Sequence, residues 1–477
     1  MSFFDDVKVA APLTAVPNLG CLLDIPTGGP VIGLKGETIT NGGFHPINGI
    51  VGEGNVGKTQ LALYMYVILL GRYADAHGLV YDTETTLKKI RQIIAAETNA
   101  PHLLYTDEEV IENDRIDEYD IKQSTFVTAV EYLGDEMYKL MKDKMSKRPT
   151  TKAAMLTSPF KDRDGKPLQI QSPIAWMIDS FSLFQVSSMD EMKENDLGHS
   201  KRNMEAMRDA HAKNQLLLEL PVLTAKHGLY TILTAHLGAQ HQLDPRTPPK
   251  KILAYLSQKQ KIKNVPEKFL FVPHNVFMVY GTNTLYNSSS DKTPMYPKHA
   301  DVKKSSKHTD LTVANILSLR NKAGVSGSPF ELIMSQTEGL LATLSEFHYC
   351  KTLGRFGYSV SGSGGVIMAM DLYPDETFTR ITLRDKIRED EKLRNAIRLT
   401  SEILQISEFW AQTPRELLVS PKELYEGLKK QGYDWDELLM TRGHWTPDQY
   451  TNPVRFLSGM DLLNMYAGIY KPYWQKK

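Results

Sequence analysis

Eight consecutive residues near the start of the chain constrain its fold more than any other stretch. They are Gly52-Glu53-Gly54-Asn55-Val56-Gly57-Lys58-Thr59, and they match the phosphate-binding pattern G-x-x-x-x-G-K-[ST] at every fixed position. In this pattern glycines let backbone N–H groups approach phosphates, the lysine reaches the β- and γ-phosphates, and the last hydroxyl binds Mg²⁺. The sequence therefore predicts a nucleotide site at this loop, with Gln60 as its next residue.

The residues on either side supply the strand and the helix that the motif requires. Residues 47–51 are an apolar run typical of a short buried strand, and residues 60–70 are typical of a buried helix. The loop between them would present its amides and a helix N-terminus to an anion. A glycine-rich turn with a surface lysine is the alternative interpretation.

Two later apolar runs, GLVYDTE and IAWMIDS, end in carboxylates. In open α/β sheets the chemistry lies at the carboxyl ends of the strands, beside the phosphate loop. Glu84 is therefore a candidate general base for the water that attacks a γ-phosphate. Asp179 is a candidate Mg²⁺ ligand together with Thr59. For Asp82 and Glu84, a helix cap is the alternative role.

A third strand-like run, LYTILTAH, ends at His236 and leads into a basic segment. His236 would stand near the γ-phosphate and report its presence to that basic segment, or it is a packed histidine at the end of a strand. Residues 183–202 and 238–270 are the predicted DNA loops, because in the second of them basic residues alternate with aromatic ones. A solvated basic loop is the alternative. The residues assigned to DNA are Arg246, Lys250, Lys251, Lys259, Lys261 and Lys263.

Further along the chain, the run NILSLRNKAG places two cations two residues apart. On a strand Arg320 and Lys322 would point the same way and could together reach one anion. Apolar spacing predicts helices over residues 125–147 and 382–405. Between them, residues 146–172 are basic and contain prolines, which predicts a loop-rich insertion or a hairpin.

Composition narrows the class of protein. The chain has 56 basic and 56 acidic residues, so any nucleic-acid site must come from local segregation of charge. Its two cysteines, Cys21 and Cys350, favour a reducing compartment. No apolar run is long enough to predict a membrane span, and the first residues lack the features of a signal peptide. We therefore expect a cytoplasmic protein without a membrane partner.

The order of these motifs resembles the RecA-type recombinases, most closely the bacteriophage branch typified by UvsX. The resemblance rests on TITNGGFHPINGIVGEGNVGKT, YDTE, MIDS, TAH and LRNK, and covers roughly residues 20–405. It implies that Glu84 is the catalytic glutamate and that His236 is the sensor before the second DNA loop. It also implies that Arg320 and Lys322 contact the nucleotide of a neighbouring subunit. Arg91 stands where the family has an adenine-packing tyrosine, so it is a predicted nucleotide-site residue.

The resemblance implies an α/β fold, with a RecA-like P-loop NTPase core around a central, mostly parallel sheet. Scattered Pro and Gly residues predict an extended arm over 1–30, which either packs as an edge strand or contacts a neighbouring subunit. The rest of the expected organisation is the ATPase core over 31–375 and a mainly helical domain over 376–477. The implied activity is a DNA-dependent ATPase that uses ATP and Mg²⁺, binds single-stranded DNA and promotes homologous pairing and strand exchange.

Two further implications concern partners and alternatives. The resemblance implies self-assembly into a filament or a ring, with mediator and single-strand-binding proteins as possible partners; if the protein is phage-encoded, its place is the cytoplasm of the host. A ring helicase of the DnaB type and a RecA-like ATP-binding scaffold or regulator are alternative functions.

Overall fold

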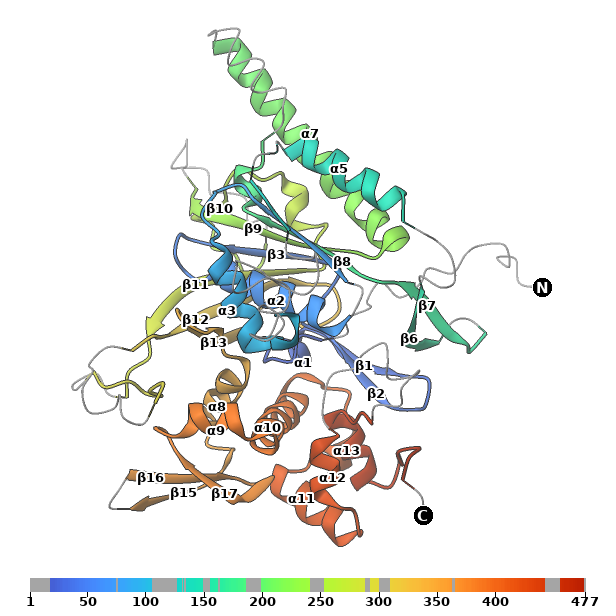
Figure 1. The fold of residues 1–477 in the computed structure, drawn as a ribbon, viewed down its shortest axis with the longest axis vertical. Coiled ribbons are helices and arrows are strands. Elements are labelled where there is room, and N and C mark those ends of the chain that lie inside the picture. Colours follow the sequence, from blue (N-terminus) through green and yellow to red (C-terminus); the bar gives the residue numbers. More distant parts are fainter. Residues whose placement is uncertain are drawn as a thin grey trace, which may run out of the picture.

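The largest element of the fold is a ten-stranded β-sheet with the order β14-β13-β12-β11-β3-β9-β8-β4-β5, in which β10 pairs with β9. Figure 1 shows helices packed on this sheet and a second layer of helices beyond one side of it. The chain is described from a computed structural model, which covers residues 18–73, 76–104, 127–130, 132, 134–148, 155–161, 164–185, 199–240, 253–287, 292–299, 309–362, 365–441 and 455–475.

The centre of the sheet is parallel. The strands that run parallel to one another are β11 (Asn275–Thr284), β3 (Ile47–Gly52), β9 (Leu229–Ala239), β8 (Ile174–Asp179), β4 (His77–Asp82) and β5 (Val127–Ala129). Antiparallel strands complete it: β12 (Leu311–Asn321), β13 (Pro329–Ser335), β14 (Gly339–Leu340) and β10 (Gln260–Ile262). The predicted α/β class with a mostly parallel central sheet is therefore confirmed.

Side chains alternate between the two faces of the sheet, as the two-residue period of a strand requires. One face packs under α2 (Lys58–Arg72) and α3 (Lys89–Asn99), and Ile50 and Ile232 belong to that core. The other face packs under α5 (Gly134–Ser146) and α7 (His199–His227), and Val51 and Leu233 belong there. Both faces are covered, which explains why these strands read as continuous apolar runs.

Most elements expected from the sequence are present, with one correction. The predicted helix over 125–147 is wrong at its start, because residues 127–129 form strand β5 and the helix begins only at Gly134. Pairing with β4 at the edge of the sheet prevails there over the helical spacing of apolar residues. The basic insertion contains an antiparallel hairpin of β6 (Met155–Lys161) and β7 (Pro167–Gln171).

The described part of the expected N-terminal arm packs into the fold instead of extending from it. Leu19, Leu22 and Leu23 are buried, and they lead into α1 (Asp24–Thr27) and the hairpin of β1 (Gly29–Ile32) and β2 (Thr38–Asn41). The indole N–H of Trp410 donates to the carbonyl of Ile25 at 2.9 Å. This segment therefore joins the sheet to the C-terminal helices. Residues 1–17 lie outside the described residues.

The C-terminal layer has its own hydrophobic core. Its helices are α8 (Ala342–Thr352), α9 (Leu383–Glu389), α10 (Glu391–Phe409), α11 (Pro421–Lys430), α12 (Trp435–Met440) and α13 (Gly459–Tyr466). A small sheet of β15 (Gly357–Gly362), β16 (Gly365–Met370) and β17 (Tyr373–Thr379) packs with them, so the domain boundary expected at residue 375 falls inside a strand. Capping boxes begin α11 and α13.

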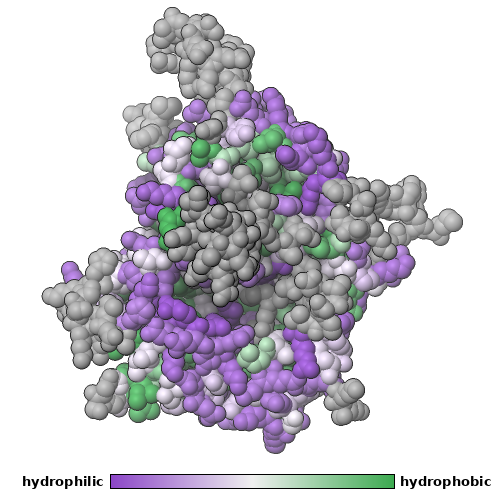
Figure 2. Space-filling view, viewed as in Figure 1, coloured by the Kyte–Doolittle hydropathy of each residue, from purple (hydrophilic) through white to green (hydrophobic). Residues whose placement is uncertain are grey.

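Short 3₁₀ turns connect several of these elements: η1 (Pro101–Leu103), η3 (Phe181–Leu183), η4 (Glu267–Leu270) and η6 (Arg415–Leu417). In the view of Figure 2, hydrophilic residues cover most of the coloured surface over the C-terminal layer. Among the helices of the described residues, none is long and apolar enough to cross a membrane.

Candidate nucleotide site

The loop between β3 and α2 has the geometry that its glycines predict. Gly57 adopts a φ of 92°, and a Cβ added there would lie 2.5 Å from the sulfur of Met334. A Cβ at Gly52 would lie 2.6 Å from the carbonyl oxygen of Val279. Glu53, Gly54 and Asn55 are exposed at the tip of the loop. A side chain at either of the two packed glycines would displace the loop from the position that lets its backbone face an anion.

Lys58 is buried at the start of α2, and its Nζ donates to the backbone carbonyl of Glu53 within the loop. Burial lowers the pKa of Lys58, while the nearby carboxylates of Asp179 and Glu84 act in the opposite direction. The ammonium group is thus held inside the curve of the loop and faces the carboxylates at the ends of β8 and β4.

Asp179 ends β8 and is held by two hydroxyl groups. Thr59 Oγ1 donates to Asp179 Oδ2 at 2.7 Å, and Thr234 Oγ1 donates to the other carboxylate oxygen. Burial raises the pKa of Asp179, and these two hydrogen bonds oppose that rise. The sequence predicted the pair of Thr59 and Asp179; the structure brings them into contact across 120 residues.

The chemistry of this pair suits Mg²⁺, which prefers hard oxygen ligands. In the described part of the chain, no group of three or more His, Cys, Asp or Glu side chains could hold a metal ion. A magnesium ion bound by Thr59 and Asp179 would therefore take its remaining ligands from phosphates and water, as Mg²⁺ commonly does in nucleotide sites.

Glu84 and His236 meet beside the same loop. Glu84 Oε1 lies 2.7 Å from His236 Nε2, and each side chain is 28% exposed. The register of the sheet places His236, because this residue of β9 stands opposite Gly52, the last residue of the neighbouring strand β3. The turn before Glu84 is fixed by Asp82, whose carboxylate accepts from the amides of Glu84 and Leu87 at 3.0 and 2.7 Å.

Sequence reasoning missed three hydroxyl residues that position this site. Besides Thr234, they are Thr83, whose Oγ1 accepts from the amide of Ser180 at 2.8 Å, and Ser182. Ser182 Oγ accepts from the amide of His236 at 2.9 Å and donates to the carbonyl of Lys263 at 2.9 Å. The available signal is sequence position: Thr83 and Ser182 follow shortly after β4 and β8, and Thr234 lies two residues before His236 on β9.

The basic segment is physically joined to His236. The amide of Lys263 donates to the carbonyl of His236 at 2.8 Å, and β10 pairs with the end of β9. Lys259, Lys261 and Lys263 are exposed. Arg246, Lys250 and Lys251 lie outside the described residues, as does most of the other predicted DNA loop, 183–202.

Arg320 and Lys322 are not brought to the phosphate loop of their own chain. Arg320 stands opposite Val276 on β11, and Val276 stands opposite Gly49, three residues before the end of β3. That separation is about 10 Å along the strand. Arg320 Nη1 donates to the carbonyl of Leu270 at 2.7 Å, and Lys322 Nζ donates to that of Val272 at 2.9 Å. Both cations therefore lie at the opposite edge of the sheet.

Two other predicted residues have different surroundings. The side chain of Gln60 donates to the carbonyl of Ser335 at 3.1 Å, so it ties α2 to β13. Arg91 is exposed in the first turn of α3, where its amide donates to the carbonyl of Lys88. A nucleotide contact by either side chain stays a prediction.

Comparison with known proteins adds little to this geometry. No family model matches the sequence, and no curated protein matches it. Among solved structures, the fold is similar to a crystal structure of the RadB recombinase, at 16% sequence identity and a TM-score of 0.32, covering 63% of this chain and 92% of that chain. A likeness this weak says nothing about activity, so the chemistry rests on the residues themselves.

Proposed function

We propose that the chain is an ATP-dependent recombinase of the RecA type, related to the phage branch that its motifs resemble. On this proposal it acts in the cytoplasm, binds single-stranded DNA, assembles on it and promotes homologous pairing and strand exchange. The observation that carries the proposal is the gathering of Lys58, Thr59, Asp179, Glu84 and His236 at the carboxyl ends of adjacent parallel strands. Each of these residue types has a defined use in phosphoryl transfer.

Within one subunit, each of these residues would have a separate task. The loop amides and Lys58 would bind and orient the β- and γ-phosphates of ATP, and Thr59 and Asp179 would hold Mg²⁺, which would supply positive charge to the phosphate oxygens. Glu84 accepts a proton from the attacking water. Glu84 also lies within hydrogen-bond distance of His236, at 2.7 Å. A γ-phosphate that binds His236 would release Glu84 for that role.

Coupling to DNA is supported by the hydrogen bonds around His236. A shift of the His236 backbone toward a phosphate would also shift Ser182 and Lys263, because both are hydrogen-bonded to that backbone. Lys263 belongs to the exposed basic segment, and Tyr255, eight residues earlier in the same segment, is 47% exposed and able to stack on a base. We expect nucleotide binding to order this segment for DNA.

Assembly is supported by the position of Arg320 and Lys322. They lie too far from their own phosphate loop to touch a nucleotide there, so on this proposal they act on the nucleotide of the next subunit. Cations supplied across an interface stabilise the transition state and make hydrolysis depend on assembly.

The first test is steady-state ATP hydrolysis with and without single-stranded DNA. We expect DNA to stimulate the parent chain, and Lys58→Ala, Glu84→Gln and Arg320→Ala each to remove that activity. Hydrolysis at the same rate with and without DNA would favour the alternative function of a RecA-like scaffold or regulator. Strand exchange with the parent chain, scored on gels, then separates a recombinase from a ring helicase.

Mixing two inactive variants tests the shared site directly. A Lys58→Ala subunit keeps Arg320, and an Arg320→Ala subunit keeps the phosphate loop. In a 1:1 mixture about a quarter of the interfaces join the phosphate loop of an Arg320→Ala subunit to the Arg320 of a Lys58→Ala subunit. We therefore expect about a quarter of the parent activity. A mixture as inactive as its components would refute action of Arg320 across an interface.

A further inference from the structure

A cleft of about 630 Å³ separates α3 and the first turn of α8 from α9 and α10. Among the described residues that line it, five carry cationic side chains: Lys298, Arg384, Arg388, Arg394 and Arg398. The carboxylates among the described lining residues are those of Glu97 and Glu338. Three more carboxylates lie against its arginines, Asp310 at 2.9 Å from Arg384, Asp385 at 3.6 Å from Arg388 and Glu346 at 3.8 Å from Arg398. The question is therefore which cations have no close carboxylate.

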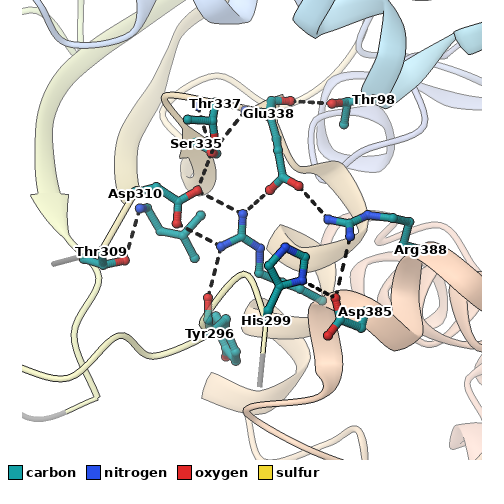
Figure 3. A network of polar contacts seen from close by, with 12 residues as sticks. Thr98, Tyr296, His299, Thr309, Asp310, Ser335, Thr337, Glu338, Asp385 and Arg388 are labelled. Carbon is teal, nitrogen blue, oxygen red and sulfur yellow. Dashed lines mark hydrogen bonds and ion pairs between the residues drawn. The ribbon is translucent and has the colours of Figure 1, made fainter. Parts of the chain in front are cut away.

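Two of the arginines are neutralised by the protein itself. Arg384 donates to both oxygens of Asp310 at 2.9 Å and to Glu338, and Arg388 donates to Glu338 at 2.7 Å. Figure 3 shows these carboxylates arranged around the two guanidinium groups. Asp385 lies 3.6 Å from Arg388 and completes the network. These arginines join the sheet to α9, and their charge is already matched.

The other three cations have no hydrogen-bonded carboxylate among the described residues. Arg394 Nη1 donates to the carbonyls of Ile387 and Arg388 at 2.9 Å, which fixes the side chain and leaves its charge unmatched. Arg398 Nε is buried without a hydrogen bond in the described part of the chain, and it lies 3.8 Å from a carboxylate oxygen of Glu346. Lys298 is half-buried. Partly buried like charges held this way favour a bound anion.

The shape and lining of the cleft indicate the kind of anion. Its volume falls within the range of small-molecule sites, and such sites often lie between packed units of a chain. No aromatic side chain is among its described lining residues, so it offers no platform for stacking bases. Guanidinium groups bind phosphate oxygens through paired hydrogen bonds. The first turn of α8 adds amides and a favourable dipole on the opposite wall.

We propose that this cleft is a second anion site, separate from the phosphate loop, which binds the di- or triphosphate group of a small molecule through Arg394, Arg398 and Lys298. None of the described residues that line it belongs to the loop over 52–59. The negative charges of the ligand would face the cations of Lys298 and Arg394 and the buried guanidinium group of Arg398. The site does not depend on the recombinase proposal, because it uses none of the catalytic residues.

Calorimetric titration of the full chain tests the site, with Lys58→Ala in every protein to weaken binding at the phosphate loop. We expect tripolyphosphate to bind this background at one site per chain. We expect Arg394→Gln with Arg398→Gln to weaken that binding more than 30-fold, because each charged hydrogen bond is worth at least tenfold. Arg415→Gln, an exposed arginine outside the cleft, is the matched control and should bind like the background.

Lys298→Gln provides a second variant that does not depend on the packing of α9. Its side chain is half-buried, so it should fold normally, and we expect at least fivefold weaker binding of tripolyphosphate. Titration with ATP and adenosine identifies the source of the phosphate. If ATP binds with the same affinity as tripolyphosphate, the site recognises phosphate alone. If ATP binds more tightly, the ligand is a nucleotide. Equal binding by the background and the cleft variants, or binding of single-stranded DNA there in place of tripolyphosphate, would overturn the proposal.

Discussion

Replacing Arg384 by glutamine should be among the most damaging single changes in the C-terminal layer. Its side chain is 3% exposed and donates to Asp310, Glu338 and the carbonyl of Tyr296. Burial alone would raise the pKa of Asp310, but hydrogen bonds from Arg384 and Ser335 outweigh it and hold that pKa below its usual value. Without the guanidinium group Asp310 keeps only the hydroxyl of Ser335, and Glu338 keeps only the half-exposed Arg388. Breaking a buried pair in this way costs about 3–5 kcal/mol.

The assay is urea unfolding, followed by tryptophan fluorescence, since Trp410 and Trp435 are buried in the affected layer. Arg388→Gln is the matched control. It removes a guanidinium group from the same network, but that side chain is 50% exposed, so we expect a cost under about 1 kcal/mol. Adding Asp310→Asn to Arg384→Gln should recover about 1–3 kcal/mol, because one unpaired charge is removed. Equal costs for Arg384→Gln and Arg388→Gln would refute the reasoning.

Three further changes give distinct readouts. Burial, Lys322, His45 and Arg320 lower the pKa of His274 from 6.5 to about 4, so the unfolded chain binds more protons between these values and stability falls as the pH falls. From about pH 7.5 to about pH 5 this loss is about 2 kcal/mol, and urea unfolding of His274→Gln should lack it. Thr234→Val removes one donor to the buried carboxylate of Asp179 and should cost about 1–3 kcal/mol in the same assay, whereas Thr234→Ser should cost less. Gly28→Ala should lower the melting temperature strongly, because its Cβ would lie 1.8 Å from the carbonyl oxygen of Asn41; Gly29→Ala, with nothing within 4 Å, should leave it nearly unchanged.

The central strands could be predicted from sequence because burial on both faces makes them continuous apolar runs. The runs that end at Asp179 and His236 are examples, and each is a strand of the parallel sheet. The phosphate loop was equally clear, since Gly57 must tolerate a left-handed backbone and close packing against Met334. In both cases the physical requirement, burial for the strands and backbone conformation for the loop, acts on residues that are neighbours in the sequence. A local sequence pattern is therefore enough to predict it.

What the sequence could not show depends on contacts between distant segments. Thr234 looks like any β-branched strand residue, and only the fold reveals that its hydroxyl faces Asp179. The residues around Leu22 contain the Gly and Pro expected of an arm, yet Gln405 donates to the carbonyl of Leu22 at 2.9 Å from 383 residues away. The strand at 127–129 likewise exists because β4 offers an unpaired edge there. No pattern in these segments records such partners.

The two ends of β3 explain why the predicted site residues fall into two groups. Residues that come directly after parallel strands in sequence gather at the end of β3 marked by Gly52, because the carboxyl ends of those strands share one edge. Arg320 lies on β12, which runs antiparallel to β11, so its position late in the strand brings it to the other edge. A chain with this topology cannot place Arg320 on its own nucleotide without reversing a strand. If Arg320 serves phosphoryl transfer at all, the nucleotide must belong to another copy, and the topology of the sheet then makes assembly a condition for catalysis.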